Sequence, residues 1–223
     1  MIKFVQYFYY LATNWNIAIA WHIIQNEIKG EKHYGINTTG ADQLSGLAKK
    51  GVDISHATIY MPVSYDVLEE FFTEVQLHTF THFVDIGSGM GRAMCVAAHN
   101  KVPLISGVEL STELYNIAKT NIANTSTLVP NAVFKLYNND AFYFEIESNV
   151  DCIFMFNPFD DTIMSAVLHN IGTSLHAHPR DMTIIYINPL QQHLFIEHGY
   201  EQVYHSKKMH YLEGSIFVKL NST

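Results

Sequence analysis

The sequence has few cysteines and few cations, and each shortage excludes a class of protein. Only 2 of its 223 residues are cysteine, and Cys95 and Cys152 lie inside apolar runs, so we interpret both as small buried hydrophobic residues. The 13 lysines and arginines stand against 21 acids, which gives a net charge of -8 and argues against duplex nucleic acid as a partner. We therefore expect one large domain, or one domain with an appendage, in a reducing, cytoplasmic compartment.

Long uninterrupted apolar runs are also missing. The segment MIKFVQYFYYLATNWNIAIAWHII imitates a signal peptide, because it combines a lysine, an apolar stretch and an Ala-x-Ala sequence that ends at Ala20. Four polar residues interrupt its apolar run: Gln6, Thr13, Asn14 and Asn16. We interpret the segment as a retained helix, and we predict no membrane partner, since a spanning helix needs about 20 largely uninterrupted apolar residues.

The 13 histidines are scattered along the chain and do not form a helical i, i+4 zinc-binding pair with a nearby glutamate. The closest pair, His176 and His178, lies in an expected loop before Pro179, where a solvated or capping role is favoured over a metal site. We predict no metal.

The pattern of apolar residues divides the chain near residue 80. Residues 1–80 favour helix and loop, with helices near 3–28 and 64–77, and we predict that they form an N-terminal helical extension or lid. From residue 81 to 223, short apolar runs alternate with helix-length segments, which is typical of βαβ units in a parallel sheet. The expected strands are 82–86, 103–109, 132–137, 151–156 and 182–188. The expected helices between them are 92–100, 111–124 and 160–175.

The end of the chain follows a different pattern. Residues 200–206 and 214–220 flank a polar connection and predict an antiparallel hairpin at the sheet edge. The predicted fold class is therefore α/β, a doubly wound and mainly parallel sheet with a C-terminal antiparallel hairpin and an N-terminal helical extension.

A glycine-rich loop follows the first expected strand in FVDIGSGMGR. Glycines at 87, 89 and 91 permit a tight turn and let a ligand approach the main chain. Arg92 stands where a dinucleotide fingerprint has its third glycine, and the Lys-Ser/Thr of a phosphate-binding P-loop is absent. The loop therefore indicates a small-molecule site, although a plain strand-to-helix corner has the same local pattern.

Polar residues also end the next strands. Glu109 ends the second in GVELS, where an acid can accept both hydroxyls of a ribose, and Asp140 follows the third beside an aromatic rim. The fourth ends in FMFNPFDD. Ligands of open α/β sheets bind at this edge, whereas each acid taken alone, Asp85 included, also suits a helix cap or a turn.

From about Gly35 to Leu220, the chain resembles the class I S-adenosylmethionine methyltransferases. DIGSGMG is similar to their first motif, GVELS to the second, NNDAF to the third and NPF to the fourth. The resemblance implies a seven-stranded Rossmann-like sheet and S-adenosyl-L-methionine as cofactor. TIYMPVSYDVLEEFF also resembles a pre-motif of the subgroup that includes histone core lysine methyltransferases and their small bacterial relatives.

The resemblance also implies roles for individual residues. Asp85, Gly87 and Gly89 would hold the methionine end of the cofactor, with Tyr60 and Tyr65 reaching its carboxylate. Glu109 would hold the ribose, and Asp140 with Ala141 the adenine. The predicted cofactor site is completed by Ser88, Gly91 and Leu110.

Asn157, Pro158 and Phe159 form the candidate catalytic element. Amino-group methyltransferases have a related motif, in which an Asn or Asp is followed by Pro-Pro and an aromatic residue. The Asn or Asp accepts hydrogen bonds from the target amine. This chain departs from that motif, because it has one proline and its aromatic residue comes one position earlier. We predict N-methylation of a protein lysine or a small amine. Two other functions stay open: O-methylation or another transfer to a small molecule, and non-catalytic cofactor binding. For the Asn157-Pro158-Phe159 motif itself, a strand that ends at a proline and is followed by a core phenylalanine also stays open. The sequence predicts no oligomeric state.

Overall fold

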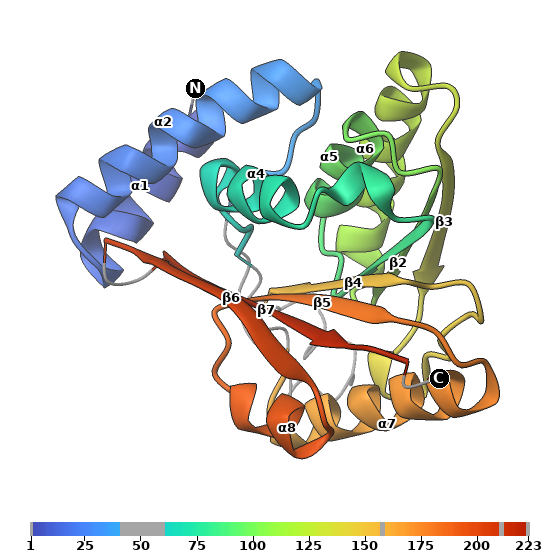
Figure 1. Ribbon diagram of the computed structural model, residues 1–223. Coiled ribbons are helices and arrows are strands. Elements are labelled where there is room, and N and C mark those ends of the chain that lie inside the picture. The colour runs from blue at the N-terminus through green and yellow to red at the C-terminus, as the bar shows by residue number, and fades with distance from the viewer. Residues whose placement is uncertain (1, 41–60, 157–158, 210–211, 222–223) are drawn as a thin grey trace.

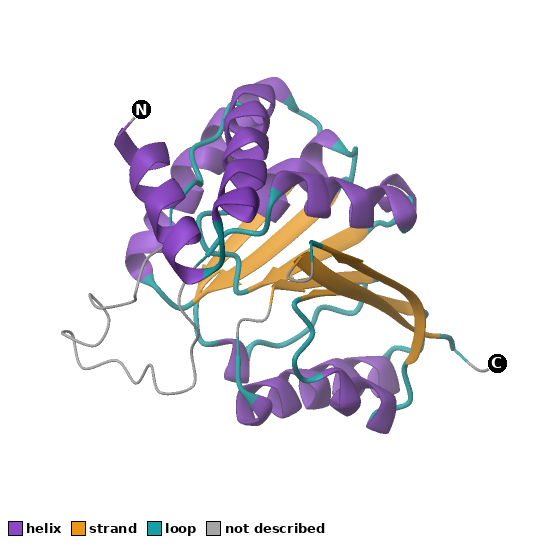
Figure 2. Ribbon diagram, turned by 90° about the vertical axis from the view of Figure 1, so that its left-hand side faces the viewer, coloured by secondary structure: helices purple, strands orange, loops and turns teal. Residues whose placement is uncertain are grey.

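The computed structural model describes residues 2–40, 61–156, 159–209 and 212–221, and it contains a seven-stranded sheet between two layers of helices (Figures 1 and 2). The strands are β1 His82–Ile86, β2 Leu104–Glu109, β3 Val133–Asn138, β4 Cys152–Phe156, β5 Met182–Ile187, β6 Glu201–Lys208 and β7 Leu212–Lys219. Their order in the sheet is β3-β2-β1-β4-β5-β7-β6. β7 pairs antiparallel with both β5 and β6, while the other neighbours are parallel. The predicted fold class and the C-terminal hairpin are confirmed.

The helices lie on both faces of this sheet. They are α1 Ile2–Asn14, α2 Ile17–Tyr34, α4 Tyr65–Glu74, α5 Arg92–His99, α6 Thr112–Leu128, α7 Asp161–Ala177 and α8 Gln192–Glu197, with 3-10 turns η1 Leu77–Thr79 and η2 Ala141–Tyr143. In Figure 1, α4, α5 and α6 lie above the sheet and α7 and α8 below it, while α1 and α2 lie beside α4.

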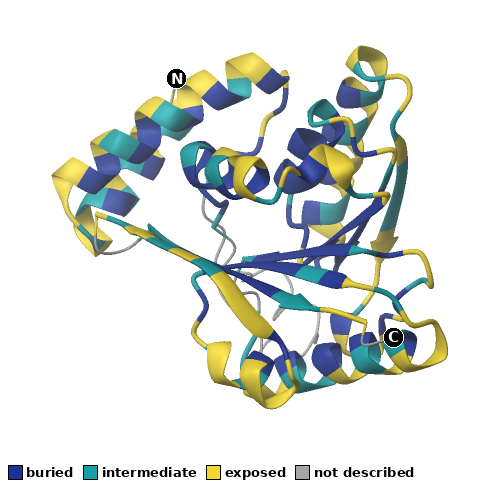
Figure 3. Cartoon of the chain, in the orientation of Figure 1, coloured by how far each residue is buried: buried dark blue, intermediate teal, exposed yellow. Residues whose placement is uncertain are grey.

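Side chains of the central strands alternate between two cores, as the period of a strand requires. On β4, Cys152 and Phe154 face the cluster under α4 and α5, while Ile153 and Met155 face the cluster over α7. All four are at most 2% exposed. Figure 3 shows the resulting buried centre and the more exposed edge strand β6.

Helix α4 is part of the main core although it precedes the sheet in sequence. Its Phe72 contacts Phe83 and Phe154 edge to face, with ring centroids 5.5 and 5.9 Å apart. Each buried phenylalanine contributes about 1.5–3 kcal/mol relative to an exposed one. The apolar face of α4 is therefore held against the middle of the sheet.

The prediction of one helix near 3–28 is wrong, because the chain forms two helices there. Asn16 has an extended backbone, and its side chain accepts a hydrogen bond from the Ile19 N–H at 2.9 Å, which starts α2. Helix α2 continues to Tyr34 and ends at Gly35, whose φ of 68° suits glycine. Between them, α1 and α2 bury their own apolar cluster, which includes Leu11 and Ala20.

Other elements also differ from the predictions. Helix α4 ends at Glu74 rather than near residue 77, and Gln76 takes a left-handed φ of 52° before η1. The short helix α8 was not predicted, because its six residues contain only one fully buried side chain, that of Phe195, and too few turns for a periodic pattern.

Candidate active site

The glycine loop joins β1 to α5, and its backbone angles explain its composition. Gly87, Gly89 and Gly91 have φ values of 80°, 54° and 81°, in the left-handed region that favours glycine. The N–H groups of Gly87 and Ser88 both donate to the carbonyl of Val108 on β2, at 3.0 and 2.9 Å. The loop is thus fixed to the neighbouring strand, directly before Gly91 caps α5.

The Glu109 side chain, at the carboxyl end of β2, is buried under the same loop. One carboxylate oxygen accepts the Gly89 N–H at 2.7 Å, and the other accepts the Ser111 N–H at 2.7 Å. Burial raises the pKa of Glu109, while these backbone donors act in the opposite direction. Each oxygen retains capacity for a second donor, so Glu109 could hold a ligand hydroxyl while it orders the loop.

Asp85 and Glu109 place two carboxyl groups in one buried region. Asp85 lies in β1, immediately before the loop, and its side chain is 2% exposed. Burial first, and then the charge of Glu109, raise the pKa of Asp85 well above its usual range. Carboxyl groups with such perturbed pKa values favour a cationic ligand that would relieve their repulsion.

Ser88 and Gly107 show how closely the loop approaches β2. A Cβ atom added to Gly107 would lie 2.4 Å from Met94 Sδ and 3.1 Å from Ser88 Cβ. The Ser88 hydroxyl is buried, and no hydrogen-bond partner for it occurs within the described residues. A buried hydroxyl in this position is a group that a ligand could satisfy. The loop therefore fits a small polar cofactor.

The ends of β2 and β3 are tied together next to the loop. Asn138 Nδ2 donates to the carbonyls of Glu109 and Leu110 at 2.8 and 3.0 Å. Asp140 then caps η2 by accepting the Phe142 N–H at 2.9 Å, and Ala141 behind it is buried. Asp140 thus has the turn-forming role that the sequence allowed as an alternative to ligand binding. It lies at the edge of the sheet where the adenine is predicted to bind.

Aromatic side chains follow this edge in η2. Phe142 and Tyr143 are 36% and 72% exposed, with ring centroids 4.8 Å apart. Asn170 of α7 fixes η2 by donating to the Phe142 carbonyl at 3.0 Å. Phe159 is half-buried and packs against the core on the α7 side, and Asp160 caps α7. Two exposed aromatic rings therefore follow the end of β3, in a turn that α7 holds in place.

Among the described residues, Tyr65 contacts Tyr34 of α2, Thr38 after it and Arg92 of α5. Its hydroxyl lies 3.1 Å from Thr38 Oγ1, and its ring stacks on Tyr34 and also contacts the guanidinium of Arg92. Burial raises the pKa of Tyr65 to about 12. Its predicted contact with the methionine carboxylate stays a prediction. Three other predicted site residues lie outside the described residues: Tyr60, Asn157 and Pro158.

The topology brings four predicted strand ends to one edge of the sheet. β1 pairs with β2 and with β4, and β2 pairs with β3, all parallel. The strand order reverses between β1 and β4, and crevices at such points bind ligands in open α/β folds. The glycine loop lies at this point. Among described residues, no group of three or more His, Cys, Asp or Glu side chains has a metal-binding arrangement.

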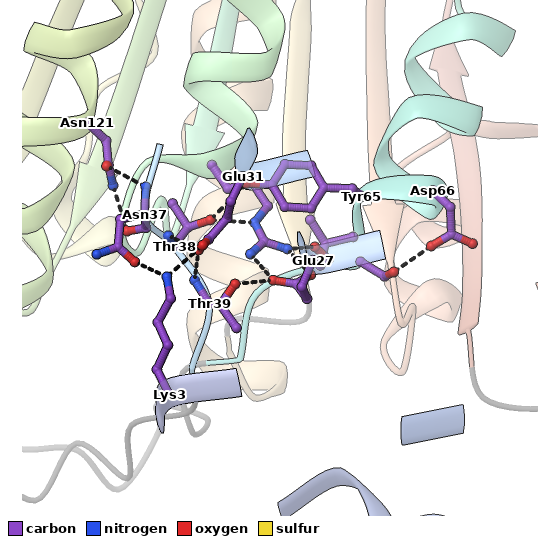
Figure 4. Close-up of polar contacts among 12 residues, drawn as sticks. Lys3, Glu27, Glu31, Asn37, Thr38, Thr39, Tyr65, Asp66 and Asn121 are labelled. Atoms are coloured by element: carbon purple, nitrogen blue, oxygen red, sulfur yellow. Dashed lines mark hydrogen bonds and ion pairs between the residues drawn. The ribbon is translucent and has the colours of Figure 1, made fainter. Parts of the chain in front are cut away.

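Sequence reasoning missed the buried polar network beside the loop. Arg92 and Glu27 form an ion pair with side chains 4% and 0% exposed, and Thr38 and Asn121 join it (Figure 4). The sequence signal for it is an arginine directly before the apolar run AMCVAA in α5. Its partner, 65 positions earlier, has no local signature.

Comparison with known proteins identifies the family. The sequence profile described as "Histone methylation protein DOT1" matches residues 50–171, more than half of the chain, and this span contains the glycine loop, Glu109 and Asp140. The chain belongs to the DOT1 family. The resemblance to the histone lysine methyltransferase subgroup is thereby confirmed. A search of curated proteins found no match.

Solved structures confirm the fold of this DOT1 family member. An S-adenosylmethionine-dependent methyltransferase from Thiobacillus denitrificans, in complex with S-adenosyl-L-homocysteine, has 14% identity and a TM-score of 0.55, covering 72% of this chain and 93% of that one. One from Aquifex aeolicus has 13% identity and a TM-score of 0.54, covering 68% and 88%. An RNA methyltransferase from Salinibacter ruber has 13% identity and a TM-score of 0.51, covering 72% and 94%.

Family and fold together establish the activity class. The protein is an S-adenosylmethionine-dependent methyltransferase with the Rossmann-like fold of that class, and it transfers a methyl group to an acceptor. Within the parts of the chain that the structure describes, no helix has the length and apolarity needed to cross a membrane.

Proposed function

We propose that this enzyme methylates the ε-amino group of a protein lysine. The observation that carries the proposal is the DOT1 match, because it spans residues 50–171 and so includes every predicted motif from the glycine loop to Asn157. We further propose that it acts in the cytoplasm, as its composition suggested.

The cofactor would lie along the carboxyl ends of β1, β2 and β3. Asp85 and the loop residues Gly87, Ser88, Gly89 and Gly91 would hold its methionine end. Two observations support this: the buried carboxyl of Asp85 would gain a cation to offset its repulsion with the neighbouring acid, and the Ser88 hydroxyl would gain a partner.

Glu109 and Leu110 would hold the ribose, and Asp140 with Ala141 the adenine. The carboxylate of Glu109 is already oriented by the Gly89 and Ser111 N–H groups, so little reorganisation is needed before it accepts two hydroxyls. Asn138 fixes the backbone of Glu109 and Leu110, which sets the spacing between these two subsites. Tyr60 and Tyr65 would approach from the segment before the sheet, which we propose acts as a lid over the site.

The acceptor nitrogen must be neutral before transfer, since its lone pair forms the new N–C bond as the C–S bond breaks. For a lysine of reference pKa about 10.4, neutralisation at pH 7 costs roughly 4.6 kcal/mol. An apolar mouth lowers the lysine pKa by disfavouring its charged form. Phe142, Tyr143 and Phe159 supply apolar surface at the site edge, which supports such a mouth.

Asn157 would orient the amine. It follows β4, which pairs with β1 in the register Ile86 to Met155, so the end of β4 lies beside the strand that leads into the glycine loop. An asparagine oxygen accepts a hydrogen bond from a neutral amine without the full negative charge that would keep the amine protonated. Pro158 and Phe159 would fix this oxygen and pack against the acceptor.

Labelled methyl transfer with the Asn157→Ala variant tests the proposal. Wild-type enzyme and S-adenosylmethionine carrying a labelled methyl group are incubated with fractionated lysate and with purified histones. We expect label in protein lysine, a turnover of Asn157→Ala lower by a factor on the order of a hundred, and cofactor affinity within about twofold of wild type. Label confined to small molecules, or on oxygen, would overturn the lysine assignment; equal loss of turnover and cofactor binding would place Asn157 in the cofactor site.

A further inference from the structure

Arg92, the first residue of α5, is a buried cation that contacts three separate segments among the described residues. Its Nη1 and Nη2 atoms donate to the two carboxylate oxygens of Glu27 on α2. Its Nε donates to Thr38 Oγ1 at 2.8 Å, and Nη1 also donates to the Val63 carbonyl at 2.5 Å. Arg92 therefore links α2, the segment after α2 and the segment before α4, directly beside the glycine loop.

Residues 36–39, which we call the strap, are held by two acids of α2 (Figure 4). Thr39 Oγ1 donates to Glu27 Oε2 at 2.7 Å. The backbone N–H groups of Thr38 and Thr39 both donate to Glu31 Oε1 at 2.8 Å. Glu27 thus binds Arg92 and the strap at the same time, so the position of Arg92 and the position of the strap depend on each other.

Asn121 of α6 joins the strap to the glycine loop from the other side. Its Oδ1 accepts the Asn37 N–H at 2.9 Å, and its Nδ2 donates to the Asn37 carbonyl at 3.1 Å. The same Nδ2 donates at 2.9 Å to the carbonyl of Met90, which lies between Gly89 and Gly91. The loop is therefore held to the strap through Asn121 and, one residue beyond Gly91, through Arg92.

The chemistry of this network favours positioning over stabilisation. Burying an arginine and a glutamate removes both charges from water, and well-packed apolar residues often stabilise a protein as well or better. The rigid fork of an arginine, however, can bind several acceptors in fixed directions, which neither an apolar side chain nor a lysine can do. The arrangement thus specifies where three segments meet the loop.

We propose that Arg92, oriented by Glu27, is a positioning residue for the glycine loop, and that it makes cofactor affinity depend on the N-terminal helices. The inference rests on cofactor binding at this loop and is independent of the acceptor. Neither side chain needs to touch the cofactor, because both act through the strap, Asn121 and the start of α5.

The test uses the full-length double variant Arg92→Met with Glu27→Gln, because it removes the fork without leaving an unpaired buried charge. The dissociation constant of S-adenosylhomocysteine is measured by calorimetry, and KM and kcat are measured for S-adenosylmethionine, at a temperature where every variant is folded. We expect the dissociation constant and the KM to rise about tenfold, within the usual range of coupling between sites, and kcat at saturating cofactor to change little. Wild-type affinity in the folded double variant would overturn the proposal.

Two single variants complete the design. Asn121→Ala removes the contact with Met90 but leaves the ion pair, and it should also weaken S-adenosylhomocysteine binding. If the double variant does not fold, Asn121→Ala decides the test, and an unchanged dissociation constant in this variant overturns the proposal. The matched control is His22→Ala, which removes a 2.9 Å contact between His22 of α2 and Asp66 of α4 without touching Arg92 or the strap. It should bind the ligand normally.

The remaining outcomes are also decisive. Loss of affinity in all three variants in proportion to their loss of thermal stability would show a purely structural network and overturn the proposal. Failure of the wild-type protein to bind S-adenosylhomocysteine would overturn the assignment of the cofactor to this loop, and the inference with it. This outcome is distinguishable from the others because it concerns the wild-type protein and not the variants.

Discussion

The Gly89 N–H and the Glu109 carboxylate are joined by a hydrogen bond of 2.7 Å, which connects the glycine loop to the end of the adjacent strand. The acid proposed to hold the cofactor ribose therefore also supports the loop that we propose binds the methionine end of the cofactor. A substitution of Glu109 removes both functions together, whereas substitutions elsewhere in the site can separate them.

Glu109→Ala is expected to weaken the binding of both S-adenosylmethionine and S-adenosylhomocysteine by roughly 1.5–3 kcal/mol, because charge-assisted hydrogen bonds to the ligand are lost and the Gly89 N–H loses its acceptor. Calorimetry measures the change. Glu113→Ala, an exposed acid in the first turn of α6, is the control and should bind normally. Unchanged affinity in Glu109→Ala, or competition by NAD, would contradict the assignment.

Asp85→Asn is expected to make the ligand-free protein more stable at pH 7, by about 1 kcal/mol, while it weakens cofactor binding. In the folded protein the pKa of Asp85 is raised, so the folded state retains its proton at pH values where the unfolded chain, with a pKa near 3.8, has released it. The Asp85 contribution to stability therefore falls as the pH rises above about 4. The asparagine is neutral in both states and avoids this cost.

Urea unfolding of wild type and Asp85→Asn between pH 4 and pH 8 measures this effect. The stability difference between them should shrink toward pH 4, where the carboxyl is protonated in both states. A variant that is less stable than wild type by the same amount at every pH would show that Asp85 is an ionised, well-paired group in the folded protein.

Local patterns made most of the sheet and the glycine loop predictable. Strand β1 has the predicted bounds, His82–Ile86, and the glycines at 87, 89 and 91 indicate a turn because glycine permits left-handed backbone angles. The ion pair between Glu27 and Arg92 could not be predicted, because only the packing of α2 against α5 brings together residues 65 positions apart. The raised pKa of Asp85 likewise depends on burial, which a sequence does not display.

His82 provides a second pH dependence at the opposite end of β1. It is fully buried, with Nε2 2.7 Å from Ser106 Oγ and Nδ1 2.9 Å from Asn149 Oδ1. Burial is the main cause that lowers the pKa of His82, and Lys135 adds to it. The hydrogen bond to Asn149 and the charges of Glu147 and Asp151 act in the opposite direction.

The neutral His82 side chain should therefore make the protein less stable as the pH falls below about 6.5, where the unfolded chain gains a proton that the folded state excludes. His82→Gln cannot take up this proton, so its stability should fall less steeply between pH 7 and pH 5. Urea midpoints over this range provide the measurement. Parallel pH profiles for the two proteins would show that His82 is protonated equally in both states.

Alanine substitutions at two helical glycines should change stability in opposite directions. In an open helical position, alanine is favoured over glycine by about 0.5–1 kcal/mol. Gly172 of α7 has no neighbouring atom within 4 Å of an added Cβ, so Gly172→Ala should gain this amount. An added Cβ at Gly30 of α2 would lie 2.2 Å from Tyr65 Cγ, and contacts with Tyr34 and Arg92 hold the Tyr65 ring in its position.

Gly30→Ala should therefore lose about 1–3 kcal/mol through overpacking, which exceeds the gain in helix propensity. Because Tyr65 also contacts Thr38 in the strap, the same substitution should weaken cofactor binding, whereas Gly172→Ala should not. Urea unfolding and S-adenosylhomocysteine calorimetry on the two variants test both statements. If both variants gained stability, the Tyr65 ring would be free to move away from α2, which would contradict the close packing of Gly30 against it.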